Sequence, residues 1–124
     1  YTSHLDLWGS GKPMREFLWS EDMADASVFI LENISFQDLK GNETEIRNCH
    51  INIGSGKELS IAQLANIIKT EIEYKGEIRW DSSKPDGTMR KLCDVSKLHS
   101  LGWKHSVNID EGVHRLYQWY ITNL

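Results

Sequence analysis

Two polar stretches of this 124-residue chain hold the side chains whose types and spacing could do chemistry. The first, residues 7–17, reads Leu-Trp-Gly-Ser-Gly-Lys-Pro-Met-Arg-Glu-Phe and places Trp8 and Arg15 around a glycine- and proline-rich turn. Glycine has no Cβ, so a ligand can approach the backbone closely, and a guanidinium beside it can bind a carboxylate or phosphate through two parallel hydrogen bonds. The alternative is a hairpin corner whose Arg15 makes an ordinary surface ion pair.

The second stretch, residues 84–91, reads Lys-Pro-Asp-Gly-Thr-Met-Arg-Lys. A carboxylate such as Asp86, held in a proline–glycine turn, can accept hydrogen bonds from two neighbouring hydroxyl groups. Lys84 or Lys91 could meet a phosphate as a point charge. A solvated charged loop with no ligand explains the same composition.

Signatures of self-sufficient catalysis are missing from the sequence. The two Gly-Ser-Gly stretches, at 9–11 and 54–56, lack the third glycine of a dinucleotide fingerprint and the Gly-Lys-Ser/Thr of a P-loop, so each predicts a plain turn. The histidines form no zinc-type pair, and no tyrosine is followed four residues later by lysine. We therefore predict no catalytic, cofactor-binding or metal-binding residues here, and a chain that only holds a ligand.

Composition narrows the class of protein. A net charge of −4, with acids and bases interspersed, argues against a nucleic-acid surface, and no apolar run approaches the ~20 residues of a membrane span. Cys49 and Cys93 lack metal-ligand spacing and predict two buried, reduced thiols in a cytosolic protein. The chain begins at Tyr1 without an initiator methionine, which suggests a fragment or a processed product.

Alternating apolar and polar residues predict strands over 5–8, 49–54 and 77–81 and a short extended piece over 15–19. Residues 35–48 and 82–91 are rich in polar residues, glycine and charge, which is typical of loops.

Helical periodicity and capping signals predict about four helices between these strands. The first is capped by Ser20, and the second begins at a Ser60–Gln63 capping box and ends at Gly76. The third follows Asp94, and the fourth begins at an Asn108–Glu111 capping box. The apolar face of the first helix is expected to comprise Met23, Ala26, Ser27, Ile30, Leu31 and Ile34. The interleaving indicates an α/β fold with some parallel pairing.

These stretches together resemble the C-terminal portion of the GDP-L-fucose synthase family, among the extended short-chain dehydrogenases/reductases. The resemblance rests on residues 8–18, 21–24, 51–56, 84–92 and 101–103 and on Tyr117-Gln-Trp119. It implies that residues 1–124 form a small substrate-binding domain, and that an N-terminal Rossmann half, absent here, binds NADP and carries the catalytic groups. His4 does not match the family's catalytic histidine motif, so that role is not transferred.

The resemblance also implies substrate contacts for Trp8, Arg15, Asp86 and Lys91. Trp8 would contact the GDP-sugar, Arg15 the diphosphate, and Asp86 the ribose or nearby hydroxyls, while Lys91 would be a second phosphate cation. The expected ligands are GDP-4-keto-6-deoxymannose and GDP-L-fucose, and the full-length enzyme would be a cytoplasmic homodimer with no nucleic-acid or membrane partner. We also expect an exposed apolar face where the missing half docks.

Two other readings stay open from the sequence. The chain could serve another nucleotide-sugar epimerase, dehydratase or reductase of the same superfamily. It could also be a free-standing nucleotide-sugar-binding module or an interaction domain without enzymatic activity.

Overall fold

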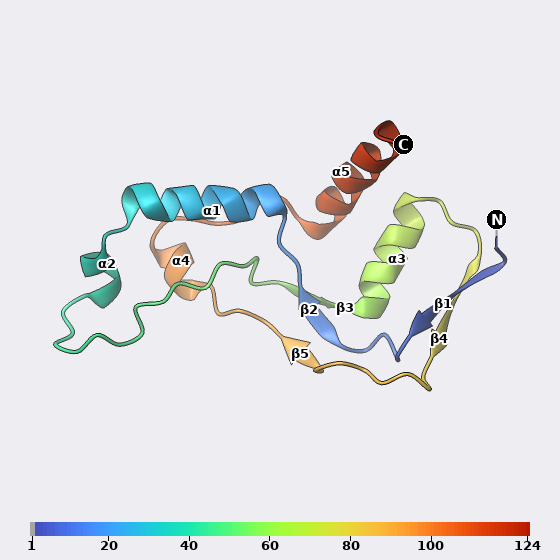
Figure 1. Cartoon of the computed structure of the whole chain (residues 1–124), viewed down its shortest axis with the longest axis horizontal. Helices are drawn as coiled ribbons and strands as arrows, with labels where there is room; N and C mark the ends of the chain where they lie inside the picture. The colour runs from blue at the N-terminus through green and yellow to red at the C-terminus, as the bar shows by residue number, and fades with distance from the viewer. Residues whose placement is uncertain (1) are drawn as a thin grey trace.

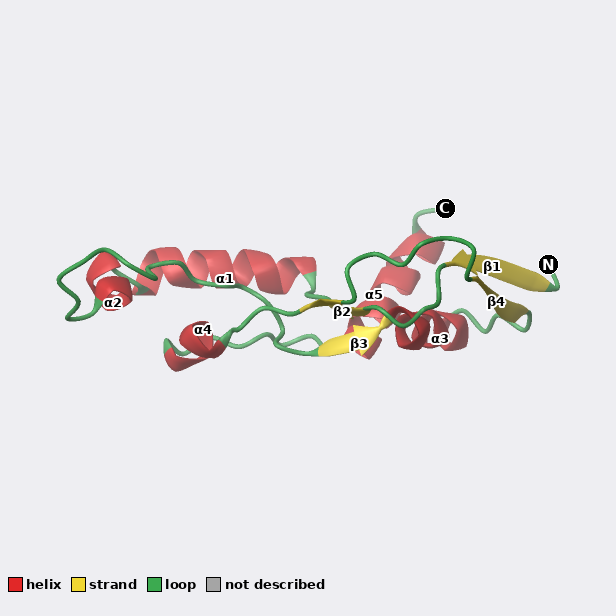
Figure 2. Ribbon diagram, turned by 90° about the horizontal axis from the view of Figure 1, so that it is seen from below, coloured by secondary structure: helices red, strands yellow, loops and turns green. Residues whose placement is uncertain are grey.

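The computed structural model describes residues 2–124, an elongated α/β chain whose elements form two groups (Figure 1). The strands are β1 (His4–Trp8), β2 (Met14–Glu16), β3 (Glu58–Ser60), β4 (Glu77–Asp81) and β5 (Arg90–Lys91). The helices are α1 (Ser20–Asn33), α2 (Phe36–Lys40), α3 (Ile61–Glu71), α4 (Ser96–Ser100) and α5 (Ile109–Thr122). Figure 2 shows α1, α2 and α4 at one end, α3, α5, β1 and β4 at the other, and the sheet of β2 and β3 between them. No helix of the described residues is long and apolar enough to cross a membrane.

Two small sheets organise the strands. β1 pairs in parallel with β4, and this register places Leu5 beside Ile78 and Leu7 beside Trp80. The second sheet has the order β3-β2-β5, with β2 antiparallel to β3 and parallel to β5. The parallel pairing expected from the alternation of strands and helices is thus confirmed, and β2 lies at the centre of the second sheet.

The helix α3 begins as its capping box predicts. The Gln63 N–H donates to Ser60 Oγ at 3.1 Å, and the Ser60 N–H donates to Gln63 Oε1 at 2.7 Å. The predicted end at Gly76 is wrong, because the helix already stops at Glu71 and Glu73 turns the chain with a φ of 52°.

The second predicted capping box, at the start of α5, does not form. Asn108 occupies the N-cap position without a side-chain cap bond. Its Oδ1 instead accepts a hydrogen bond from Lys57 Nζ at 3.2 Å, so a contact distant in sequence takes the place of the local one.

The helix α1 is also turned relative to its predicted face. Ser20 is its first residue rather than its cap, and Trp19 stands at the N-cap without a side-chain cap bond. Asp22 and Ala26 are buried, whereas Met23 and Leu31 of the predicted apolar face are exposed. The core side of this helix thus keeps Ala26 and Ile30 of the predicted face but is rotated toward Asp22 and Phe29, away from Met23 and Leu31.

The core lies where α1 meets α4. Ala26, Leu98 and Trp103 are buried together, and the indole Nε1 of Trp103 donates to Asp25 Oδ2 at 2.8 Å. Partly buried apolar side chains pack around this cluster: Leu18, Phe29, Ile30, Ile51 and Ile53.

Two segments on this side of the molecule differ from the sequence-based predictions. Residues 49–54 are not a strand: Ile51 and Ile53 pack on the core as their alternation predicts, but this backbone joins no ladder among the described residues. Lys97 Nζ instead donates to the carbonyls of Asn48 and His50. Within the predicted loop 35–48, α2 forms behind a Ser35–Asp38 capping box. The predicted burial of the thiols is wrong as well, because Cys93 is exposed and Cys49 is only half-buried.

Asp22 attaches the chain around Ser106 to α1. Its carboxylate accepts hydrogen bonds from Ser106 Oγ at 2.7 Å and from the Val107 N–H at 2.9 Å. Burial opposes ionisation of Asp22, but these hydrogen bonds outweigh it and lower its pKa below the ordinary value.

We therefore expect Asp22→Asn to cost about 1–3 kcal/mol of unfolding free energy at neutral pH, because buried donors lose a charged acceptor. Since the folded-state pKa is depressed, the carboxylate stabilises the fold above its unfolded pKa. That stabilisation is lost as the pH falls through the folded pKa. Urea unfolding at several pH values should show the gap between wild type and variant closing in acid, and a gap that stays constant would contradict this. The exposed Asp110→Asn serves as control.

Candidate functional site

The turn after β1 exposes an indole. Trp8 ends β1 with 76% of its surface exposed, and the next N–H, of Gly9, donates to the Asp81 carbonyl at 2.9 Å. Gly9 and Gly11 have φ values of 86° and 72°, and a Cβ on Gly11 would lie 2.8 Å from the Trp80 ring. Only glycine fits this close approach, which holds the turn against Trp80 of β4.

Arg15 lies half-buried in β2, and its Nη1 donates to the Met14 carbonyl at 2.7 Å. It is the one arginine of the described chain with no carboxylate in ion-pair range. The others pair with Glu45, Glu77, Glu58 and Glu111. A guanidinium that is anchored by one nitrogen and lacks an internal counter-ion is suited to bind an external anion.

Asp86 comes from the second polar stretch and reaches the first. Its Oδ1 accepts the Ser10 N–H at 2.8 Å and its Oδ2 accepts the Ser10 hydroxyl at 2.6 Å, across 76 residues of sequence. The hydroxyl and the backbone N–H of Ser10 both lower the pKa of Asp86. The carboxylate therefore ties the two polar stretches together.

Three of the four predicted site residues border one surface hollow of about 120 Å³. Its lining is Trp8, Gly11, Pro13, Arg15, Ile61, Pro85, Asp86 and Gly87. Lys91 is not part of this lining. It lies beside Arg15 in the β2–β5 register and is exposed, so the structure places it next to the hollow.

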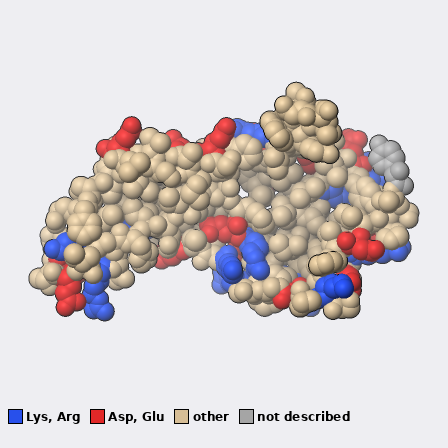
Figure 3. All heavy atoms as spheres, viewed as in Figure 1, with Lys and Arg blue, Asp and Glu red and all other residues tan. Residues whose placement is uncertain are grey.

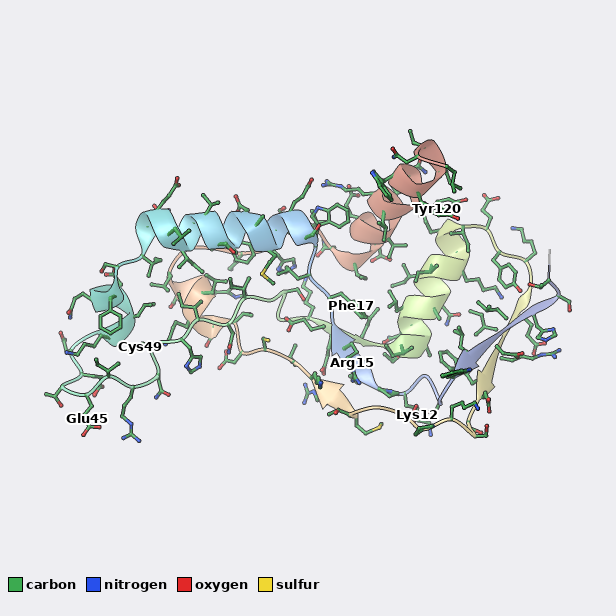
Figure 4. All side chains as sticks on the ribbon, in the orientation of Figure 1. Lys12, Arg15, Phe17, Glu45, Cys49 and Tyr120 are labelled. Atoms are coloured by element: carbon green, nitrogen blue, oxygen red, sulfur yellow. The ribbon has the colours of Figure 1, made fainter. Side chains whose placement is uncertain are left out.

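Cations gather around the hollow although the chain is acidic overall. Lys84 Nζ lies 5.4 Å from the centroid of the Trp8 ring, within the range of a cation–π contact. Figure 3 shows Lys and Arg atoms clustered over β2 and β5 in the middle of the molecule. In Figure 4, Arg15 and Lys12 lie along the lower edge of the molecule, whereas Cys49 and Glu45 lie at its left end.

Sequence reasoning missed Ser10 and Glu16. Glu16 accepts hydrogen bonds from the Gly56 N–H at 2.6 Å and the Cys93 N–H at 3.0 Å. A Cβ on Gly54 would lie 2.5 Å from Glu16 Oε1. Each Gly-Ser-Gly turn thus binds a carboxylate of the chain itself, Asp86 at 9–11 and Glu16 at 54–56, and neither is a plain turn. The closely spaced backbone N–H groups of these turns are the sequence signal for an anion-binding site. The carboxylates that bind them lie too far away in the sequence to be assigned from it.

The described residues do not fit a dinucleotide cofactor. Both turns that could cradle a phosphate are already occupied by Asp86 and Glu16. Within residues 2–124, no three side chains of His, Cys, Asp and Glu gather so as to hold a metal ion. What the arrangement can do is hold an anionic, ring-containing ligand with Trp8 and Arg15.

Comparison with known proteins shows which enzymes this chain is similar to. Residues 3–54 match the NAD dependent epimerase/dehydratase family. GDP-L-fucose synthase 1 of Arabidopsis thaliana is 46% identical over 95% of the chain and 33% of its own length. GDP-L-fucose synthase of Escherichia coli is 44% identical over 94% of the chain and 36% of its length. GDP-L-colitose synthase of Yersinia pseudotuberculosis is 32% identical over 97% and 36%. The chain thus spans about a third of the curated relatives it matches.

Solved structures agree with these relatives. A GDP-6-OMe-4-keto-L-xylo-heptose reductase from Campylobacter jejuni superposes with a TM-score of 0.92 at 41% identity, over 98% of this chain and 35% of that one. A GDP-mannoheptose C4 reductase from the same species, with NADP bound, gives a TM-score of 0.86 at 39% identity, over 96% and 35%. The chain therefore resembles the C-terminal portion of GDP-L-fucose synthases, and its residues 3–54 carry the match to the NAD dependent epimerase/dehydratase family.

Proposed function

We propose that this chain is the GDP-sugar-binding portion of an enzyme of the GDP-L-fucose synthase type. The complete enzyme would convert GDP-4-keto-6-deoxy-D-mannose to GDP-L-fucose by 3,5-epimerisation and NADPH-dependent reduction of the 4-ketone. Residues 1–124 would bind and orient the substrate for groups outside this chain, which raises the effective concentration of the reacting ketone.

The convergence of Trp8, Arg15 and Asp86 on one hollow carries this proposal. A GDP-sugar offers a diphosphate for a guanidinium and flat or apolar ring faces for an indole. The chain's net charge of −4 repels a dianion in general, so binding requires cations collected at one place. Arg15, without an internal counter-ion, and Lys84 and Lys91 close by, meet that requirement.

The sugar itself is less constrained than the nucleotide. Relatives and solved neighbours named for GDP-fucose, GDP-colitose and GDP-heptose share this portion of chain. A GDP-linked 4-keto sugar other than the fucose precursor is therefore the second candidate substrate.

The deciding experiment is a substrate comparison with the full-length protein. We expect NADPH-dependent conversion of GDP-4-keto-6-deoxymannose, with GDP-L-fucose identified by chromatography and NMR. Turnover only of another GDP-keto-sugar would support the second candidate. Binding of UDP-sugars in preference to GDP-sugars would contradict both.

We further propose that the remainder of the enzyme covers the outer face of α1. Val28 and Leu31 project from this helix at 51% and 85% exposure. Burying such side chains is favourable, so this face suits the docking of a cofactor-binding half. By resemblance to the family, that half would bind NADP, and the complete enzyme would be a cytoplasmic homodimer.

This division of labour predicts that residues 1–124 alone do not oxidise NADPH. The expected result is no loss of NADPH absorbance above a no-protein blank when GDP-4-keto-6-deoxymannose is present. The full-length protein under identical conditions is the positive control. Turnover by the isolated chain would refute the proposed separation of substrate binding from chemistry.

A further inference from the structure

Ser10 and Asp86 form a two-bond connection between the turn after β1 and the turn before β5. We name this pair, with its two hydrogen bonds of 2.8 and 2.6 Å, the Ser10–Asp86 clasp. Both bonds end on a charged acceptor, and hydrogen bonds of that kind are stronger than neutral ones.

The donor side of the clasp is fully engaged. The Ser10 hydroxyl donates its single hydrogen to Asp86 Oδ2 while its oxygen accepts the Lys12 N–H at 3.2 Å. On the acceptor side, a Cβ on Gly9 would lie 2.5 Å from Asp86 Oδ1. The carboxylate therefore lies directly against the turn at Gly9, and each of its oxygens accepts one hydrogen bond from Ser10.

The clasp holds residues 84–87 in place, and this segment lies beside both proposed substrate-binding side chains. At one end the Lys84 ammonium lies 5.4 Å from the centroid of the Trp8 ring. At the other end, a Cβ on Gly87 would lie 3.2 Å from Arg15 Nη2. A shift of this turn would therefore change the surroundings of Trp8 and Arg15 together.

We propose that Ser10 is a positioning residue for GDP-sugar binding, and that Asp86 acts through Ser10 by closing the turns rather than by accepting a substrate hydroxyl. This inference rests on the proposed function, since it assigns Ser10 and Asp86 their roles in the same GDP-sugar site. It differs from the contact that family resemblance implies for Asp86, and the two roles make opposite predictions for paired substitutions.

The test is a double-mutant cycle in the full-length enzyme with Ser10→Ala, Asp86→Ala and the combined variant, using GDP-4-keto-6-deoxymannose. If the clasp positions the site, each single change raises KM by roughly tenfold with little loss of kcat, and the double variant is no worse than either single. Ser10→Thr should recover most of the loss, because it keeps the hydroxyl. Asp86→Asn should recover only part of it, because the carboxamide oxygen can still accept the Ser10 N–H while its nitrogen can only donate to the Ser10 oxygen, without the charge. If Asp86 instead binds a hydroxyl directly, Ser10→Ala leaves KM near wild type and Asp86→Asn is as damaging as Asp86→Ala.

Ser83→Ala is the matched control. It also removes a serine–aspartate hydrogen bond, but that bond is local, because its acceptor Asp81 ends β4 only two residues before Ser83. We expect KM to stay at the wild-type value. A rise equal to that of Ser10→Ala would overturn the positioning role, because any loosening of the loop would then suffice.

A measurement made without substrate tests the Ser10–Asp86 clasp independently of the proposed function. Protein labelled with 5-fluorotryptophan should show the Trp8 resonance, assigned with Trp8→Phe, shifted in Ser10→Ala and restored in Ser10→Thr. An unshifted Trp8 resonance in Ser10→Ala overturns the clasp even where GDP-sugar binds. If Ser10→Ala shifts the Trp8 resonance but the wild-type enzyme binds no GDP-sugar, the proposed function is overturned and the clasp is retained.

Discussion

Arg15→Ala in the full-length enzyme should weaken GDP-sugar binding roughly 10- to 150-fold, equivalent to about 1.5–3 kcal/mol for a charge-assisted hydrogen-bonded pair. The physical reason is that Arg15 lines the hollow and, in the described chain, has no carboxylate to neutralise it. Its one hydrogen-bond partner among the described residues is the Met14 carbonyl, bound by Nη1, which leaves the other guanidinium nitrogens for a diphosphate. Isothermal titration with GDP and with GDP-sugar measures the loss.

The controls for Arg15 separate charge, geometry and general damage. Arg15→Lys keeps a cation but loses the planar fork, so an intermediate affinity is expected. Arg115→Ala removes an arginine that is already paired with Glu111 on α5, and it should bind like wild type. Equal affinity of Arg15→Ala and wild type for GDP-sugar would remove Arg15 from the site. The unfolding midpoint should change little, which distinguishes lost contacts from lost structure.

The sequence predicted which residues meet at the hollow better than it predicted how they meet. Trp8, Arg15 and Asp86 were selected from residue type and from family resemblance, and the hollow contains all three. The hydrogen bonds from Ser10 to Asp86 could not be predicted, because 76 residues separate the two and no local sequence rule links them. The prediction of plain Gly-Ser-Gly turns fails for the same reason, because the sequence shows their N–H groups but not which distant carboxylates bind them.

The fold shows a similar division between local and distant causes. The Ser60–Gln63 capping box depends on residues three apart and forms as predicted, whereas Asn108 binds Lys57 instead of capping its own helix. Apolar alternation identified the buried sides of Ile51 and Ile53 but could not supply a strand for their backbone to pair with. Around α1, the apolar pattern places Ala26 and Ile30 on the core correctly, but contacts with distant residues bury Asp22 in place of Met23.

Leu98→Ala should lower the free energy of unfolding by about 2–5 kcal/mol, the range for removing a fully buried leucine and leaving a cavity. Leu98 has 0% exposure and packs with Ala26 and Trp103, so its loss opens the cluster that joins α4 to α1. Urea unfolding of the chain followed by tryptophan fluorescence measures the change. Leu124→Ala, at a position with 87% exposure, is the matched control and should be near neutral.

The Leu98 variant also tests whether stability and substrate binding depend on separate parts of the fold. The cluster lies between α1 and α4 at one end of the molecule, while the hollow lies at the junction of β1, β2 and the turn before β5 (Figure 1). Folded full-length protein carrying Leu98→Ala should therefore bind GDP-sugar with wild-type affinity while melting at a lower temperature, the reverse of Arg15→Ala. A large loss of affinity in Leu98→Ala below its melting temperature would mean that the α1–α4 junction helps to shape the hollow. The two sites would then be coupled through β2, since this strand carries Arg15 and leads directly into α1.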